Sequence, residues 1–260
     1  MAFSGPRLPG LRRQQLGQSY RSGGEHYDRI RPGYPDDAVR WLFDTPALAS
    51  RAPSSVTVAD VGAGTGKYTR TLVSAGFKVH AVDPSQDMLD QLTRLLPSVP
   101  ATAGTAEQTE LEPASCDAVT VAQAWHWCDP LASAVEFDRI LKPEGMVGLI
   151  WNQLDVSVPW VHRFTRIIHA GDVLRPGFRP ELGPPFRLEA SSTSAWTQQM
   201  TPADLVELAK SRAYWLSASE TTREKVLTNL DWYLHEHLGH TASDVLDLPY
   251  LTLTWRAVRQ

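Results

Sequence analysis

The chain has 260 residues and a formal net charge of -4, with 42% hydrophobic and 21% charged residues. This composition is typical of a globular protein, and the length suits one α/β domain with an added segment, or one large and one small domain. A negative net charge gives no overall attraction to nucleic acid or to an anionic membrane, so we expect neither as a partner. Because no apolar run reaches the length of a signal peptide or a transmembrane helix, we expect a cytoplasmic protein.

Residues 1–25 are expected to form a flexible tail, because glycine and serine interrupt a basic segment that has no apolar periodicity. From residue 54 onward, short apolar strands alternate with helical patterns. The predicted strands are Val56–Val61, Lys78–Val82, Asp117–Gln123 and Met146–Trp151. The predicted helices are Thr65–Ala75, Asp87–Leu96 and Leu131–Leu141, the last of them stopped by the turn at 143–145. This alternation predicts a mostly parallel sheet covered on both faces, and we assign it to residues 26–152.

The pattern changes after Asn152. Proline and glycine recur between residues 175 and 185, and helices are then predicted at Pro202–Arg212 and Glu220–Leu238. Residues 153–260 are therefore expected to form a helical cap over a substrate pocket, with one or two strands returning to the sheet. We predict Tyr250–Val258 as the final, antiparallel edge strand. Four tryptophans from residue 151 onward are candidates to line the pocket, namely Trp151, Trp160, Trp196 and Trp215.

The segment Asp60–Gly66, with the sequence DVGAGTG, follows a predicted strand and opens a predicted helix, as a nucleotide-binding loop does. A phosphate-binding P-loop fails at Val61 and Tyr68, where that motif needs glycine and serine or threonine. A dinucleotide fingerprint requires its third glycine one position later than Gly66. A purely structural glycine turn is the remaining alternative to a ligand site.

Two carboxylates favour a cationic ligand at this loop. Asp60 precedes the first glycine by two residues, where a negative charge disfavours a pyrophosphate and suits an ammonium or a sulfonium group. Asp83 ends the next predicted strand, at the spacing where an acidic side chain binds ribose hydroxyls. A turn or helix-cap role is the alternative for Asp83. Together the two acids favour S-adenosyl-L-methionine as the cofactor.

Four stretches of the sequence resemble the class I S-adenosylmethionine-dependent methyltransferases. They are YDRIRPGYP at residues 27–35, VADVGAGTG at 58–66, AVDPSQDM at 81–88 and LKPEG at 141–145. The segment QAWHW at residues 123–127 is similar to the small-molecule subgroup that includes trans-aconitate methyltransferase-like enzymes. The resemblance implies a Rossmann-like, doubly wound sheet and methyl transfer to a small molecule. It covers residues 27–152 and weakens beyond them.

The resemblance also implies roles for individual residues. Around the methionine end of the cofactor it places Asp60, Gly62, Gly64, Gly66, Gln123 and Ala124. Around the ribose and the adenine it places Asp83, Pro84, Ser85, Met88, Ala106 and Glu107. Over the cofactor it places Tyr27, Arg31 and Tyr34, where Arg31 is either a partner of the cofactor carboxylate or a solvated surface residue.

Methyl transfer from a sulfonium requires alignment and exclusion of water more than covalent help from the protein. An acceptor hydroxyl or amine benefits from a base, whereas a carboxylate needs none. His126, between Trp125 and Trp127, is the candidate base, and a purely structural aromatic wall is the alternative. We expect transfer to oxygen or nitrogen, with a carboxylate possible.

Metal binding is not expected. Cys116 and Cys128 match no zinc or iron–sulfur spacing. The run His235–His240 has Gly239 where a zinc-protease motif needs its second histidine. Two other functions stay open from the sequence: an NAD(P)-dependent oxidoreductase with an irregular loop, and a non-catalytic binding protein that keeps the fold. The sequence gives no indication of the oligomeric state.

Overall fold

The computed structural model describes residues 30–170, 174 and 177–260. Tyr27 and the predicted tail at 1–25 lie outside the described residues. The described chain forms a seven-stranded sheet with the order β3-β2-β1-β4-β5-β7-β6. The first five strands in this order are parallel to one another, and β7 and β6 run antiparallel to their neighbours. The predicted α/β class and the doubly wound, mostly parallel sheet are therefore confirmed.

Each predicted strand is present, and the first three differ from the prediction by only one residue at an end. The parallel strands are β1 (Thr57–Val61), β2 (Lys78–Asp83), β3 (Ala101–Ala103), β4 (Cys116–Ala122) and β5 (Leu141–Leu154). Every residue of β4 is buried, because β1 and β5 flank it and helices cover both faces of the sheet. β5 is more than twice as long as the predicted Met146–Trp151, because it begins as soon as α6 (Pro130–Ile140) ends and continues to Leu154.

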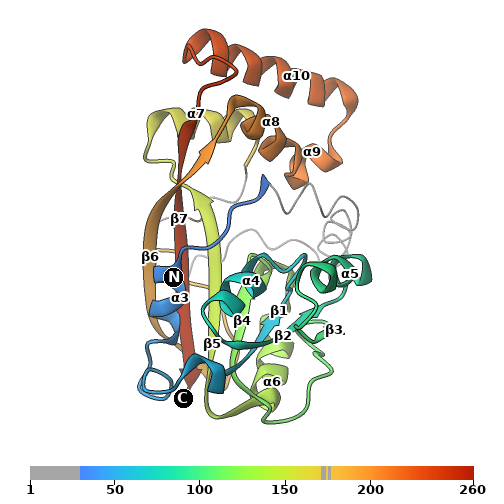
Figure 1. Ribbon diagram of the computed structural model, residues 1–260, viewed down its shortest axis with the longest axis vertical. Coiled ribbons are helices and arrows are strands. Elements are labelled where there is room, and N and C mark those ends of the chain that lie inside the picture. The colour runs from blue at the N-terminus through green and yellow to red at the C-terminus, as the bar shows by residue number, and fades with distance from the viewer. Residues whose placement is uncertain (1–29, 171–173, 175–176) are drawn as a thin grey trace.

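Helices cover the two faces of the sheet (Figure 1). One face packs against α3 (Asp36–Phe43), α4 (Lys67–Ser74) and α5 (Gln86–Leu95) through a cluster that includes Leu42, Leu72 and Leu92. The other face packs against α6 (Pro130–Ile140) through Phe137 and Ile140. Short 3₁₀ turns occur at η1 (Pro53–Ser55) and η2 (Trp125–Trp127). The chain crosses from one face to the other between β1 and β4, which makes this the topological switch point.

The edge of the sheet is not where we expected it. The predicted strand at Tyr250–Val258 exists as β7 (Leu246–Arg259), but β7 lies inside the sheet between β5 and β6. The edge is β6 (Phe186–Met200), whose residues alternate between exposed and more buried positions. β6 is rich in serine, threonine and glutamine, so apolar and polar residues do not alternate clearly along it. The sequence pattern therefore does not reveal this strand.

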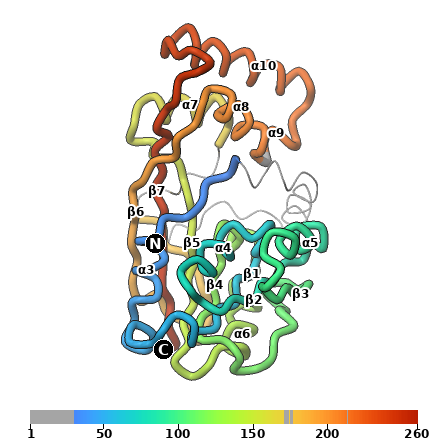
Figure 2. The backbone as a smooth tube through the Cα atoms, viewed as in Figure 1, coloured from blue at the N-terminus to red at the C-terminus, as the bar shows by residue number. Residues whose placement is uncertain are grey.

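A second layer of helices lies beyond the carboxyl ends of the parallel strands (Figure 2). It contains α7 (Pro159–Ile167), α8 (Pro202–Lys210), α9 (Ala213–Ser217) and α10 (Glu220–Asp231), followed by the π-helix η3 (Trp232–His237). We refer to these helices as the cap. The extended ends of β5, β6 and β7 run up to the cap and connect it to the sheet (Figure 1). Leu154, Leu248 and Tyr250 of these strands join the apolar core of the cap.

Candidate active site

The loops that follow β1, β2, β3 and β4 meet at one edge of the sheet. Parallel strands bring their carboxyl ends to the same edge, and ligands of open α/β sheets bind there at the switch point. Apart from Arg31 and Tyr34, all the described residues that the sequence analysis assigns to the cofactor come from the ends of β1 and β2, from these loops or from the first turn of α5. The topology therefore brings these residues to one region of the molecule.

The three glycines of the loop at 62–66 differ in what surrounds them. All three have a positive φ, which L side chains rarely adopt. A Cβ atom on Gly62 would lie 2.5 Å from the Cβ of Ala124, and one on Gly66 would lie 2.9 Å from the Cγ of Leu92. A Cβ on Gly64 would meet nothing within 4 Å. Gly62 and Gly66 thus allow close packing of the loop, whereas Gly64 borders open space that a ligand can approach.

Asp83, at the end of β2, ties this loop to the next one. Its Oδ2 accepts a hydrogen bond from the Gly64 N–H at 2.8 Å, and its Oδ1 accepts one from the Ser85 N–H at 2.9 Å. The carboxylate is buried, and burial raises its pKa against the opposing effect of these two hydrogen bonds. Each oxygen keeps acceptor capacity for a further donor, such as a ribose hydroxyl.

Asp60 is completely buried below the glycine loop. Its oxygens accept hydrogen bonds from the hydroxyls of Thr69, at 2.6 Å, and Thr120, at 3.4 Å. Burial raises the pKa of Asp60 to about 7, because these bonds offset only part of the lost hydration and because the charge of Asp83 is near. The loop therefore rests on two carboxylates that repel each other, an arrangement that a cation would stabilise.

Two hydroxyl groups of the same region have no hydrogen-bond partner among the described residues. They are the Oγ1 of Thr65 in the glycine loop and the phenol oxygen of Tyr68 in the first turn of α4, and both atoms are buried. The Tyr68 ring packs edge-on against Tyr34, with the ring centroids 4.8 Å apart. A buried polar atom without a partner is costly, so these hydroxyls suit a polar ligand at the loop. Sequence reasoning does not select either residue.

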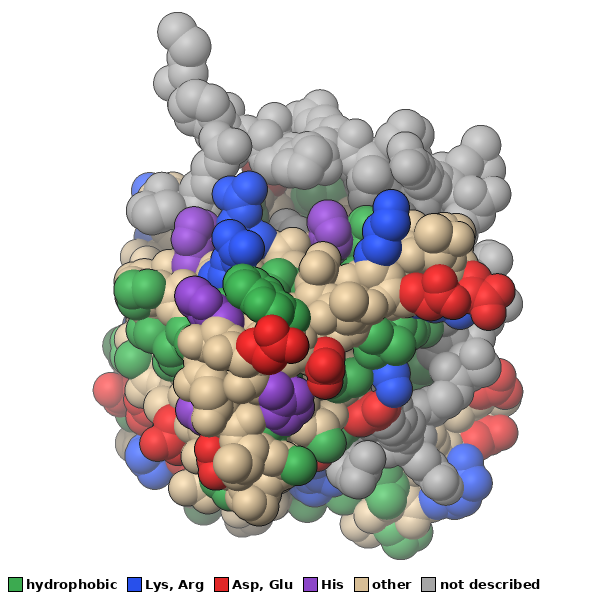
Figure 3. Space-filling view, turned by 90° about the horizontal axis from the view of Figure 1, so that it is seen from above, with side chains coloured by type: hydrophobic (Ala, Val, Ile, Leu, Met, Phe, Trp, Pro, Cys, Tyr) green, Lys and Arg blue, Asp and Glu red, His purple; other side chains and the backbone are tan. Residues whose placement is uncertain are grey.

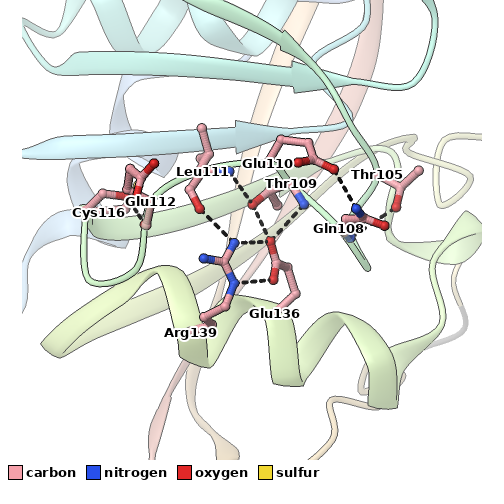
Figure 4. Close-up of polar contacts among 10 residues, drawn as sticks. Thr105, Gln108, Thr109, Glu110, Leu111, Glu112, Cys116, Glu136 and Arg139 are labelled. Atoms are coloured by element: carbon pink, nitrogen blue, oxygen red, sulfur yellow. Dashed lines mark hydrogen bonds and ion pairs between the residues drawn. The ribbon is translucent and has the colours of Figure 1, made fainter.

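A polar cluster on α6 holds the loop that carries Ala106 and Glu107 (Figure 4). Glu136 of α6 accepts hydrogen bonds from the N–H and the hydroxyl of Thr109, and it is paired with Arg139 at 2.7 Å. Arg139 also donates to the Leu111 carbonyl. Ala106 is buried, and the Glu107 carboxylate accepts from the N–H of Asp129, which ties this loop to the N-terminus of α6.

Gln123 and Ala124 follow β4 and lie against the glycine loop and β5. Gln123 has a φ of 58°, and its side chain donates to the carbonyl of Asn152 at 2.7 Å. Asn152 in turn donates from its side chain to the carbonyl of Gly33, also at 2.7 Å. These bonds connect β4, β5 and the segment before α3, which passes between the sheet and the cap (Figure 1).

The three aromatic residues after Ala124 have different environments. Trp125 is buried in the core and donates to the carbonyl of Glu181 at 3.0 Å. His126 is exposed and packs against Trp127, with the ring centroids 4.5 Å apart. The exposure of His126 leaves it accessible to a ligand, whereas Trp125 has a structural role.

The remaining predicted residues lie on either side of this region. Pro84 is exposed at the start of the loop before α5, and Met88 is buried in the first turn of α5. Arg31 donates to the carbonyl of Ser211 in the cap at 2.8 Å. Arg31 thus fixes the segment before α3 to the cap.

The four candidate tryptophans do not converge. Trp151 is buried in the sheet core, where it packs edge-on against Trp255. Trp160 and Trp215 pack against the apolar core of the cap, and Trp196 stacks on Tyr250. Of the four, Trp196 lies next to the residues that surround Asn152, because its indole N–H donates to Thr252.

A cavity of about 490 Å³ lies within the cap, between α7, α9 and α10. Its lining includes Arg163, Arg166 and Lys225, and none of its lining residues comes from the glycine loop or the other sheet-edge loops. Figure 3 looks down onto the cap and shows Lys, Arg and His side chains gathered on part of this face. This cavity is separate from the candidate site at the sheet edge. Across the described ranges, no group of three or more His, Cys, Asp or Glu residues could hold a metal ion.

The fold and the loop define a Rossmann-like cofactor-binding protein, and comparisons with known proteins identify its family. Residues 59–149 match the model of a methyltransferase domain. The chain is 41% identical to an uncharacterized methyltransferase of Mycobacterium tuberculosis over 246 residues, which cover 94% of this chain and 97% of that protein.

Solved structures share the fold. A candidate type II methyltransferase of Anaeromyxobacter dehalogenans matches with a TM-score of 0.63 and 24% identity, over 88% of this chain and 97% of that one. An N-methyltransferase of Haemonchus contortus, in complex with phosphomonomethylethanolamine and S-adenosylhomocysteine, matches with a TM-score of 0.50 and 17% identity. The match covers 97% of this chain and 60% of that one.

This chain belongs to the class I S-adenosylmethionine-dependent methyltransferases. The resemblance that the four sequence stretches indicate is therefore confirmed at the level of the class, and the protein is a methyltransferase. Among the described helices, none has the length and apolar character that crossing a bilayer requires.

Proposed function

We propose that this methyltransferase binds S-adenosyl-L-methionine at the sheet edge and transfers its methyl group to a small molecule. The observation that carries the proposal is the glycine loop itself. Gly64 borders open space, Asp83 holds its N–H from one side, and buried Asp60 lies beneath the loop. Two carboxylates suit a cofactor with an ammonium and a sulfonium group and disfavour a pyrophosphate.

The described residues fit this cofactor by their chemistry. Asp83 offers acceptor capacity for ribose hydroxyls, and the buried hydroxyls of Thr65 and Tyr68 offer polar partners near the loop. The negative charge of Asp60 favours the cationic end. Pro84, Met88, Ala106 and Glu107 flank the ribose and adenine side, and Gln123 and Ala124 lie under the methionine side. These roles extend the family resemblance to named positions of this chain.

The cofactor supplies a methyl group on a sulfonium sulfur, which is an excellent leaving group. The residues of the chain therefore have to align the acceptor and keep water away. We assign cofactor binding to residues 26–152, with Arg31 and Tyr34 over the cofactor, and acceptor binding to the cap region at 153–260. The cap helices lie above the sheet edge (Figure 2), which supports an enclosed pocket for a small acceptor over a surface for a macromolecule.

We assign the acceptor atom to oxygen or nitrogen, a carboxylate oxygen included. The Haemonchus contortus enzyme, which has the same fold, holds the small molecule phosphomonomethylethanolamine beside S-adenosylhomocysteine, and this supports a small acceptor here. For an acceptor that must lose a proton, His126 is the proposed base. Its exposed ring, beside Trp127 and next to the loop residues Gln123 and Ala124, supports this role.

The direct test is a screen for turnover. Purified protein is incubated with S-adenosylmethionine and a panel of small acids, amines and alcohols, and release of S-adenosylhomocysteine is measured. We expect release that depends on a particular small acceptor. Turnover confined to a protein or nucleic acid substrate would contradict the small-molecule assignment.

A further inference from the structure

Tyr250 of β7 carries a buried hydroxyl that makes no hydrogen bond within the described residues. The whole residue is only 1% exposed. Its ring stacks on Trp196, with the ring centroids 5.1 Å apart, and this contact fixes the direction of the hydroxyl. An unbonded phenol in such a position costs stability, and a phenylalanine would pack there without that cost. Packing alone therefore does not explain why this position carries a hydroxyl.

Two arginines lie close to this hydroxyl. Arg212, between α8 and α9, is 8% exposed, and Arg31 donates to the carbonyl of Ser211, the residue before Arg212. Burial raises the pKa of Tyr250 to about 12, and the positive charges of Arg212 and Arg31 act against this rise, as they do only from nearby. Both guanidinium groups therefore lie close enough to the phenol for their charges to act on it. All three groups donate hydrogen bonds, so together they suit an anionic oxygen ligand.

This cluster is linked to the cofactor edge by a chain of hydrogen bonds. The Gln123 side chain donates to the carbonyl of Asn152, and the Asn152 side chain accepts from Thr252 at 2.6 Å. The Thr252 hydroxyl accepts from the indole of Trp196 at 2.8 Å, and Trp196 stacks on Tyr250. Thr252 and Tyr250 are two residues apart on β7, so their side chains share one face of the sheet.

The position along the strands separates this cluster from the glycine loop. Tyr250 pairs with Leu154, whereas the last residue of β4, Ala122, pairs with Ile150. Four residues of strand span about 13 Å. The cluster thus lies beyond the end of β4, on the cap side, where an acceptor would enter.

We propose that Tyr250 and Arg212 form a binding site for an anionic group of the methyl acceptor, a carboxylate or a phosphate. This inference rests on the proposed function, because it concerns the acceptor of the same reaction. The carboxylate of the cofactor is another possible source of such an anion, and the experiment below separates the two sources.

The test uses matched anionic and neutral probes on protein saturated with S-adenosylhomocysteine. Phenylacetate and phenyl phosphate are titrated by calorimetry beside phenylacetamide, which has the same ring without the charge. We expect both anions to bind and the amide to bind at least about tenfold more weakly. Tyr250→Phe and Arg212→Gln should each weaken anion binding at least about tenfold. Arg166→Gln, which changes an arginine of the separate cap cavity, should leave it unchanged.

The affinity for S-adenosylhomocysteine distinguishes the possible failures. We expect Tyr250→Phe to keep that affinity within about twofold. If Tyr250→Phe instead weakens cofactor binding and spares anion binding, the cluster holds the cofactor carboxylate and the inference is wrong. Cofactor-loaded protein that binds neither anion also overturns it while leaving the proposed function intact. Failure of wild-type protein to bind S-adenosylhomocysteine would instead overturn the proposed function.

The thermal stability of Tyr250→Phe gives an independent readout. Because the hydroxyl has no partner among the described residues, its removal should leave the melting temperature of the free protein equal or raise it. A clear fall in melting temperature would mean that the hydroxyl makes a structural hydrogen bond, and this would contradict a site kept for a ligand.

Discussion

At the scale of single residues, Asp60 links stability to function. Its pKa is raised to about 7 by burial, so the folded chain binds a proton between about pH 4 and 7 that the unfolded chain has lost. The stability that this proton provides is fully present below the usual pKa of an aspartate and is lost as the pH rises toward 7. Above pH 7 the folded protein carries a buried charge, which we interpret as the partner of a cationic cofactor.

We predict that Asp60→Asn raises the melting temperature of the free protein at pH 8, by about 3 °C or more. The amide has the shape of the carboxylate but removes its charge, and the Thr69 and Thr120 hydroxyls can reorient to bond it. The gain should shrink as the pH falls toward 4, because Asp60 is then neutral in the folded wild type. Calorimetric scans across this pH range measure the effect.

The same variant should lose at least about tenfold in affinity for S-adenosylmethionine. If Asp60→Asn is more stable and still binds the cofactor with wild-type affinity, Asp60 is not part of the cofactor site.

Replacing Asp83 tests the cofactor site through its affinity. In Asp83→Asn, one of the two backbone donors, Gly64 or Ser85, loses its acceptor, because an amide nitrogen cannot accept a hydrogen bond. We expect the Kd for S-adenosylhomocysteine to rise at least about tenfold in isothermal titration calorimetry. Asp87→Asn is the matched control, since Asp87 is an exposed aspartate four residues along the chain, and it should bind as the wild type does.

His126 is accessible, and its predicted role is catalytic. We expect His126→Ala to slow methyl transfer at least about tenfold in a steady-state assay, while the affinity for S-adenosylhomocysteine stays the same. His162→Ala changes another exposed histidine, on α7 in the cap, and serves as the control. Full activity in the His126 variant would leave this residue only a place in the aromatic surface beside Trp127.

Residues that carry a recognisable motif could be placed from the sequence, and residues without one could not. Gly62, Gly64 and Asp83 come together as their spacing predicts, because spacing after a strand determines which loop a residue occupies. Thr65 and Tyr68 belong to the same loop and helix turn, yet only the structure reveals that their hydroxyls are buried without partners. Hydrogen-bond satisfaction depends on tertiary neighbours, which a single sequence does not list.

At the scale of secondary structure, the same contrast separates the two halves of the sheet. β1, β2 and β4 were predictable because strands of a buried parallel sheet are rich in apolar residues, and β4 is buried along its whole length. β6 was not, because an edge strand exposes alternate residues and its polar side chains resemble those of a loop. The antiparallel position of β7 between β5 and β6 depends on long-range pairing that local patterns do not encode.

The link between α6 and the loop at 104–112 is testable as a unit. Glu136 has a pKa that burial alone would raise, but hydrogen bonds from Arg139 and Thr109 outweigh burial and lower it. Its stabilising effect is therefore present above the usual pKa of a glutamate and is lost as the pH falls through the lowered pKa. We predict that Glu136→Gln reduces the free energy of unfolding by about 1–3 kcal/mol at pH 7 in urea denaturation.

Loosening this loop should also weaken S-adenosylhomocysteine binding, because the loop carries Ala106 and Glu107. Glu144→Gln, an exposed glutamate at the start of β5, is the control and should change neither quantity. Unchanged stability in Glu136→Gln would mean that the polar cluster in Figure 4 does not hold the loop.

At the scale of the whole molecule, a sheet with a cofactor edge supports a helical cap on the long strands β5, β6 and β7 (Figure 1). The sequence motifs are confined to the sheet half, and they were sufficient for the class of the protein. The cap and the sheet meet near Arg212 of the cap, Trp196 of β6 and Tyr250 of β7. These residues come from three separate parts of the chain. No motif connects such residues, so the proposed acceptor site could be found only from the folded structure.

The central claim is that the glycine loop with Asp60 and Asp83 binds S-adenosylmethionine. Isothermal titration calorimetry of the purified chain with S-adenosylmethionine, S-adenosylhomocysteine and NAD tests it most directly. We predict micromolar or tighter binding of the first two and no detectable binding of NAD. Binding of NAD in preference to S-adenosylmethionine, or binding of none of the three, would contradict the claim.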